Sequence, residues 1–139
     1  MPTGNGHSLQ TKILRSLFVK FPILQVVCVY LTQHKGLKIS YHRDEDDTYW
    51  RIQCERIVAY KVINEEFSRT GYLITLPVDG AFFEILDSPW ISEFGQREDR
   101  ILDKCKHYVL QFYDETIEII AQDFAFEQLK EKPFINYSK

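Results

Sequence analysis

The chain has 139 residues, of which 45% are hydrophobic, 14% aromatic and 27% charged, with a net charge of −3. This length and apolar content suit one globular domain and exclude a disordered chain. The first 43 residues hold six Lys or Arg and no Asp or Glu. Because these charges are interspersed, we interpret the asymmetry as two segments that neutralise each other on packing; the alternative is a nucleic-acid or membrane surface formed by residues 8–43.

The N-terminal part of the chain is expected to be a flexible segment followed by a helix. Leu9, Ile13 and Leu17 recur every four residues, and Ser8 can cap the segment, which predicts a short basic amphipathic helix over residues 8–20. We expect it to lie against a sheet, with membrane binding as the alternative. The expected organisation is a flexible terminus at 1–7, a single globular domain at 8–129 and a C-terminal tail at 130–139.

The most apolar run, residues 21–31, is shorter than the roughly 20 residues that a transmembrane helix needs. No small-residue cleavage site follows it, so we interpret it as part of a buried strand. The alternating pattern of residues 37–42 predicts a second strand. A tight turn at Lys35–Gly36 would join the two strands, with Thr32 opposite Ile39 and Tyr30 opposite Tyr41.

The segment Tyr49 to Ile63 alternates as a third strand, but Arg56 falls on the apolar parity, which predicts a bulge or a break near Glu55–Arg56. Short strands are expected at 72–76 and 81–86. Ser88 followed by Pro89 is typical of a helix start, so we expect one short helical turn near 89–94.

The clearest element is the hairpin of residues 107–126. A loop centred on Asp114–Glu115 would set Phe112 opposite Ile117, and would place His107, Gln111 and Glu118 together on the more polar face. A four-residue loop at 113–116 is equally compatible with the pattern.

These patterns predict a mainly β fold with about seven antiparallel strands and minor helix. The sheet would be curled, as a partial barrel or a sandwich, because no helix is long enough to connect parallel strands.

Motifs for cofactors and catalysis are not found. The acidic loop 44–47 fits part of a calcium template, but Tyr49 stands where that template needs Gly. Cys105 and His107 would share a strand face at a separation too long for a catalytic pair. No phosphate-binding glycine loop occurs. We therefore expect no catalytic residue, no metal and no cofactor, and the three widely spaced cysteines favour the cytoplasm.

The remaining hypothesis is a small, soluble, non-enzymatic domain that recognises another protein, as an accessory or toxin-neutralising protein. Aromatic and acidic residues near loops would suit a basic partner surface, whereas no specific nucleic acid and no transmembrane segment are expected. The candidate interaction surface comprises Glu65, Glu66, Trp90, Tyr113, Asp114 and Glu115. The alternative is a small-molecule-binding β-barrel, or an enzyme whose site is assembled from distant residues. Its candidate pocket comprises His107, Gln111, Tyr113 and Glu118.

Overall fold

The fold was analysed in a computed structural model of the chain, which describes residues 10–13, 24–32, 36–64, 82–95 and 100–133. The elements in chain order are β1 (Gln10–Ile13), β2 (Leu24–Leu31), β3 (Leu37–Arg43), β4 (Thr48–Asn64), β5 (Phe82–Leu86), α1 (Pro89–Glu93), a 3-10 turn (Ile101–Lys104), β6 (Lys106–Gln111) and β7 (Glu115–Leu129). They confirm a mainly β protein with little helix.

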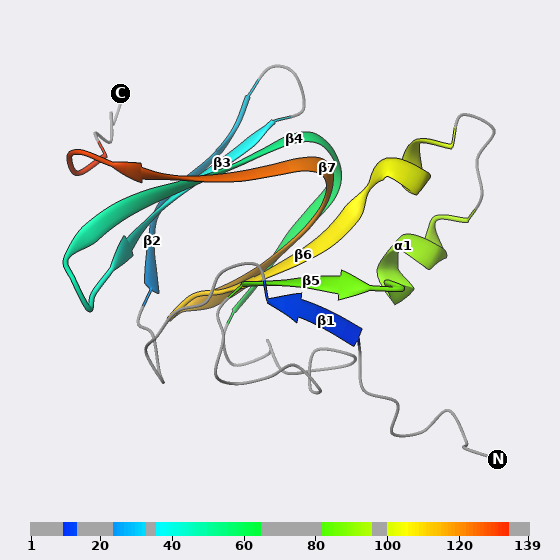
Figure 1. Cartoon of the computed structure of the whole chain (residues 1–139), viewed down its shortest axis with the longest axis horizontal. Helices are drawn as coiled ribbons and strands as arrows, with labels where there is room; N and C mark the ends of the chain where they lie inside the picture. The colour runs from blue at the N-terminus through cyan, green and yellow to red at the C-terminus, as the bar shows by residue number, and fades with distance from the viewer. Residues whose placement is uncertain (1–9, 14–23, 33–35, 65–81, 96–99, 134–139) are drawn as a thin grey trace, which may run out of the picture.

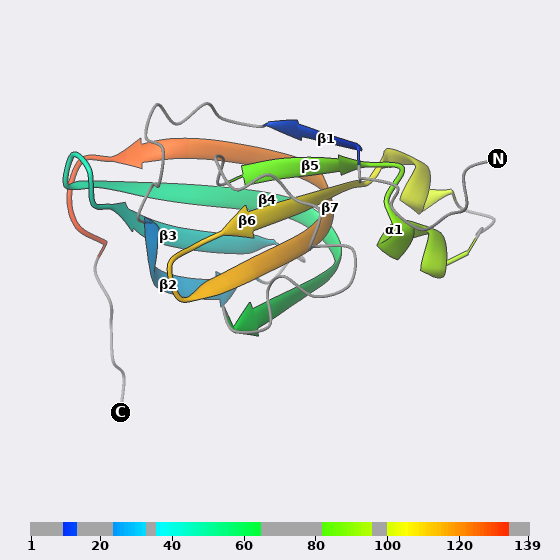
Figure 2. The same ribbon diagram turned by 90° about the horizontal axis from the view of Figure 1, so that it is seen from below.

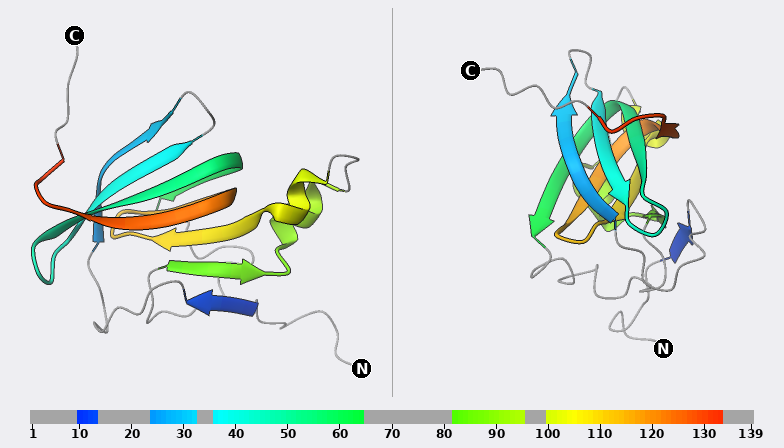
Figure 3. Two further views of the ribbon diagram at one scale, coloured as in Figure 1. Left: turned by 45° about the horizontal axis from the view of Figure 1, so that its top comes forward. Right: turned by 90° about the vertical axis from the view of Figure 1, so that its left-hand side faces the viewer.

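All the strands belong to one antiparallel sheet in the order β1-β5-β6-β7-β4-β3-β2. The sheet is curled and unclosed, and β4 and β7 bend together through its middle (Figure 1). Figure 3 shows the same curl from two other sides. Six of the predicted strands are therefore present, as β2 to β7; the one expected at 72–76 lies outside the described residues.

The bend of β4 follows the predicted irregularity. Arg56 has a φ of 53°, and the pairing of β4 with β7 shifts between Ile57 and Ala59. A bulge bends a strand and increases its twist, so one long strand can serve two parts of a curled sheet. Its first part pairs with both β3 and β7, and its second part pairs only with β7 among the described residues. The prediction of a bulge near Glu55–Arg56 is confirmed.

The core lies on the inner face of the curl. Its buried residues come from β2 to β7 and the β6–β7 turn: Leu24, Leu37, Ile39, Tyr41, Ile52, Cys54, Phe82, Leu110, Phe112, Ile117, Ile119 and Ala121. The rings of Tyr41, Phe82 and Phe112 contact one another at 5.4–5.6 Å between centroids. This inner face is filled by side chains.

The expected N-terminal helix is not found where it can be examined. Gln10–Ile13 form strand β1, which pairs with β5 from Gln10 opposite Leu86 to Ile13 opposite Phe83. The unpaired backbone groups along the edge of β5 offer a ladder, and this tertiary interaction outweighs a weak local helical pattern. The rest of residues 8–20 lies outside the described part of the chain.

Both predicted hairpins form, but with different registers. In β2 and β3, Val29 lies opposite Ile39 and Leu31 opposite Leu37, and the Thr32 N–H donates to the Gly36 carbonyl at 2.9 Å. The connection is therefore longer than a turn at Lys35–Gly36. The predicted pairs of Thr32 with Ile39 and of Tyr30 with Tyr41 were wrong.

The β6–β7 turn is also displaced from its expected position. Leu110 lies opposite Ile117 and Gln111 opposite Thr116, and the Phe112 N–H donates to the Glu115 carbonyl at 2.8 Å. The loop is thus centred on Tyr113–Asp114, and the predicted pair of Phe112 with Ile117 was wrong. Ile117 thus lies opposite a residue two positions from its expected partner. Because side chains alternate with a period of two, this even shift leaves every residue on its expected face.

The short helix begins as expected. Pro89 occupies the first turn of α1, and the Ser88 side chain accepts a hydrogen bond from the Ile91 N–H at 3.1 Å. This is the N-cap arrangement that the Ser-Pro pair predicted. Helix α1 lies at one end of the sheet, beyond the end of β5 (Figure 2).

Candidate functional site

The outer face of the sheet brings together three polar side chains that are distant in sequence. On β6, His107 lies opposite Ile85 of β5 and Ile120 of β7, so Glu118, two residues before Ile120, is its diagonal neighbour. Ser88 lies two residues beyond the end of β5 and caps α1. Strand pairing therefore sets His107 between Ser88 and Glu118.

The three side chains form a continuous hydrogen-bonded series. Nε2 of His107 is 2.7 Å from Oε1 of Glu118, and Nδ1 of His107 is 2.6 Å from Oγ of Ser88. A carboxylate can only accept, so Nε2–H donates to Glu118. In the neutral ring Nδ1 then accepts from the Ser88 hydroxyl, whose oxygen accepts in turn from the Ile91 N–H.

Lys61 and Trp90 complete this arrangement. Lys61 of β4 lies opposite Glu118, and its Nζ is 3.5 Å from Oε2 of that residue. The same ammonium stands 4.3 Å from the centroid of the Trp90 ring, which itself contacts the ring of His107 edge-on at 5.3 Å. We refer to Lys61, Ser88, Trp90, His107 and Glu118 as the outer-face network.

The central pair of this network is enclosed. The side chains of His107 and Glu118 are 0% exposed, whereas that of Lys61 is 40% exposed. Removing a carboxylate from water is expensive unless it is paired and hydrogen-bonded, and here His107 and Lys61 supply those partners. The network therefore ties α1 to β4, β6 and β7 through polar contacts, although α1 itself contains no buried residue.

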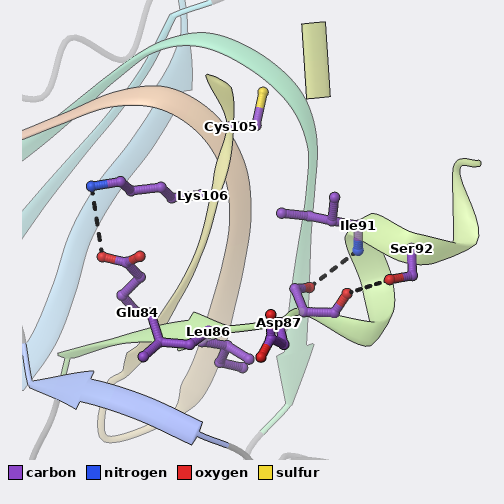
Figure 4. A pocket seen from close by; sticks show the side chains of 9 residues that line it. Glu84, Leu86, Asp87, Ile91, Ser92, Cys105 and Lys106 are labelled. Carbon is purple, nitrogen blue, oxygen red and sulfur yellow. Dashed lines mark hydrogen bonds and ion pairs between the residues drawn. The ribbon is translucent and has the colours of Figure 1, made fainter. Parts of the chain in front are cut away.

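A pocket lies beside Ser88, where β5 leads into α1. Its volume is ≈ 340 Å³, and it is lined by Glu84, Ile85, Leu86, Asp87, Ser88, Ile91, Ser92, Cys105 and Lys106. Figure 4 shows Glu84 and Lys106 reaching toward each other on one side, and Ile91 and Ser92 on the α1 side. We refer to it as the α1 pocket. Because Ser88 lines it, the α1 pocket adjoins the outer-face network.

The α1 pocket carries charges of both signs. The carboxylate of Glu84 is 3.9 Å from Nζ of Lys106, and the side chain of Glu84 is 11% exposed against 54% for Lys106. Asp87 is exposed and has a φ of 52°, a left-handed conformation that aspartate tolerates better than most residues. Burial raises the pKa of the Cys105 thiol, which opposes a reactive thiolate at the rim.

The residues of the predicted pocket divide into two groups. His107 and Glu118, which were expected on one face, are in direct contact, whereas the expected pair of Gln111 with Glu118 is replaced by Val109 with Glu118. Gln111 and Tyr113 lie at the opposite end of β6, because the strand runs away from α1 toward the β6–β7 turn. There the Tyr113 N–H donates to the Leu24 carbonyl at 2.8 Å, so this turn meets the start of β2.

The predicted interaction surface is not brought together among the described residues. Trp90 belongs to the outer-face network, whereas Tyr113, Asp114 and Glu115 lie in or beside the β6–β7 turn. Glu65 and Glu66 lie outside the described residues.

Sequence reasoning missed Ser88, Lys61 and Glu84 as site residues. Ser88 was recognised only as a helix cap, and its second partner depends on the pairing of β5 with β6. Lys61 and Glu84 each alternate with apolar residues on a strand, a pattern that is ordinary for surface charges. No local signal distinguished them.

The acidic loop between β3 and β4 satisfies its charges locally. His42 contacts Asp47 at 2.7 Å, Arg43 donates to Glu45 at 2.8 Å, and Thr48 donates to Asp46 at 2.6 Å. The hydrogen bond from Thr48 lowers the pKa of Asp46. Within the described ranges no three His, Cys, Asp or Glu side chains gather as a metal site.

Comparison with known proteins gives no relative from which to transfer a function. No protein-family model, no curated protein and no solved structure matches the chain. In the part of the chain that the structure describes, α1 and the 3-10 turn are short, and no helix has the length and apolar character to cross a membrane.

Proposed function

We propose that this protein is a non-enzymatic recognition domain that binds another protein through the end of the sheet that carries α1. The observation that supports the proposal most is the α1 pocket, which opens at the surface beside partly exposed apolar side chains. Leu86 at its rim is 39% exposed, and Ile101 in the 3-10 turn before Cys105 is 42% exposed. Partly exposed apolar side chains are groups that the core of a protein interface can cover.

One feature of the outer face supports recognition over chemistry. The inner face of the curl carries a cluster of buried apolar side chains, as the core of a small domain requires. The outer-face network holds α1 in place before any partner arrives, and a preorganised surface loses less entropy on binding. An accessory or toxin-neutralising role would need such a fixed surface.

A cytoplasmic location is part of this proposal. Cys28, Cys54 and Cys105 are all free thiols, which suits a reducing compartment.

The test is affinity capture from cells that produce the protein, with two matched variants. Leu86→Ser changes the proposed surface, and Tyr113→Ser changes an exposed apolar residue beyond the opposite end of β6, where Tyr113 is 56% exposed. We expect a reproducible partner that wild type and the Tyr113 variant retain and the Leu86 variant loses. A partner lost only in the Tyr113 variant would move the contact surface to the other end, and no reproducible partner would refute the proposal.

A second candidate function is acyl transfer at Ser88, which the Ser88–His107–Glu118 series favours. A nucleophile, a base and an orienting carboxylate in contact are the components of covalent hydrolysis. Ser88 Oγ would attack the carbonyl carbon of an ester while its proton passes to Nδ1 of His107. That proton would leave with the alcohol, and water would then release the acyl group as an acid.

Two observations make acyl transfer the weaker candidate. The Ser88 oxygen already accepts the Ile91 N–H, and Ser88 as a whole is only 6% exposed. A fluorophosphonate probe distinguishes the two functions, because it labels an activated serine and nothing in a recognition domain. Labelling of wild type that Ser88→Ala abolishes would establish the second candidate, and an unlabelled wild type would eliminate it.

A further inference from the structure

We propose that strand β2 pairs edge to edge with β2 of a second copy of this chain, antiparallel about a two-fold axis, so that two sheets join into one. Strand β2 is the last strand on its side of the sheet, and within the described ranges its strand pairing is with β3 alone (Figure 3). No residue of β2 lines the α1 pocket, so this interface is separate from the proposed recognition surface and does not depend on it.

The direction of the backbone groups in β2 follows from its hairpin with β3. The Thr32 N–H donates to the Gly36 carbonyl at 2.9 Å, so the backbone of Thr32 faces β3. Hydrogen-bonded and non-hydrogen-bonded pairs alternate along an antiparallel ladder, so the backbone of Tyr30 faces β3 as well. The N–H and C=O groups of Val29 and Leu31 therefore point away from β3, where a further strand can pair with them.

The side chains of the same segment are exposed and apolar. Val29 is 36% exposed, Tyr30 42% and Leu31 54%. Strand β2 has the sequence LQVVCVYL, without the Lys or Pro that commonly protects an edge strand from association. The segment from Val29 to Leu31 is therefore suited to pairing with another strand.

The register of a two-fold contact identifies the second copy as that strand. An axis through Tyr30 sets Val29 of each copy opposite Leu31 of the other. These are the residues whose backbone groups point away from β3, so each such pair can exchange both of its N–H···O=C hydrogen bonds. An axis through Val29 would bring in Val27 instead, which lies where the pairing of β2 with β3 is irregular.

The side chains of two identical strands are compatible in this register. An axis perpendicular to the sheet keeps each side chain on its face, so Val29 and Leu31 of both copies lie beside Ile39 and Leu37, which are 0% exposed. The Tyr30 rings meet on the other face in a non-hydrogen-bonded pair, where side chains approach most closely. Because β2 contains no charged residue, no like charges oppose each other across the contact.

The experiment is sedimentation velocity of the full chain from about 10 µM to about 1 mM, because so short a contact gives a weak dimer. We expect a dimer fraction that rises with concentration, and no larger species, because a two-fold contact closes on itself. A chain that stays monomeric up to about 1 mM would overturn the proposal and leave the edge of β2 to another partner. Assembly beyond the dimer would overturn the two-fold contact.

Substitutions at the axis make the test specific. Tyr30→Lys and Tyr30→Glu each set like charges opposite each other, so each should raise the dissociation constant about ten-fold or more. An equimolar mixture of the two variants should dimerise again, which variants that merely unfold cannot do. Tyr60→Lys is the matched control, because Tyr60 of β4 is 39% exposed, and it should dimerise as wild type does. The proposal is wrong if the Tyr30 variants dimerise as wild type does, if their mixture stays monomeric, or if Tyr60→Lys abolishes the dimer.

Discussion

Replacing His107 by leucine tests whether the outer-face network stabilises the fold. His107 and Glu118 are both 0% exposed, and their polar atoms are 2.7 Å apart. Without His107 the buried carboxylate loses its hydrogen-bond donor at 2.7 Å, and removing such a partner from a buried charged group typically costs about 3 kcal/mol or more. We expect a loss of that size in the free energy of unfolding, measured by urea denaturation with Trp fluorescence and circular dichroism.

Replacing Glu118 alone, and replacing His107 and Glu118 together, separates the loss of a hydrogen bond from the cost of a buried polar group without its partner. Glu118→Leu leaves the Nε2–H of His107 without its acceptor, which should cost about 1–3 kcal/mol. The double variant replaces both polar groups by apolar ones, so it should be more stable than His107→Leu alone. Glu127→Ala is the surface control, because its pair with Arg51 at 3.4 Å is solvent-exposed and should contribute less than about 1 kcal/mol. A His107→Leu variant as stable as this control, or a double variant that loses the sum of both single losses, would refute the reasoning.

Further substitutions and pH changes probe the sheet. A Cβ on Gly36 would lie 2.3 Å from Oγ1 of Thr32, so Gly36→Ala should destabilise the protein by about 1–3 kcal/mol in urea titrations, and adding Thr32→Ala should restore part of the loss. Arg56→Gly should stabilise the protein by about 1 kcal/mol, because Arg56 has a φ of 53°; a lower urea midpoint would contradict this. Burial raises the pKa of both Cys54 and Tyr108 to about 12, so the folded state holds these protons more tightly than the unfolded chain. Their contribution to stability should be complete below about pH 9 and lost as pH rises toward 12, and unfolding curves that do not change over this range would count against it.

The sequence alone determined the parts of this protein that depend on local chemistry. Apolar runs and the alternation of apolar and polar residues together predicted the six strands β2 to β7. The parity slip at Arg56 predicted the bulge, and the Ser88–Pro89 pair predicted the start of α1. The same alternation predicted that His107 and Glu118 would share a face.

Tertiary structure decided which strands meet and at what register. Gln10–Ile13 form a strand because they pair with the edge of β5. The helical pattern around them is short, and an isolated short helix is too unstable to compete with that pairing. Both hairpins differ from their expected registers, by two residues in β6–β7, which keeps each residue on its face, and by three in β2–β3, which does not. Ser88, Lys61 and Glu84 gained their neighbours only through strand pairing, a long-range interaction that no local pattern encodes, and so the candidate site appeared only in the folded chain.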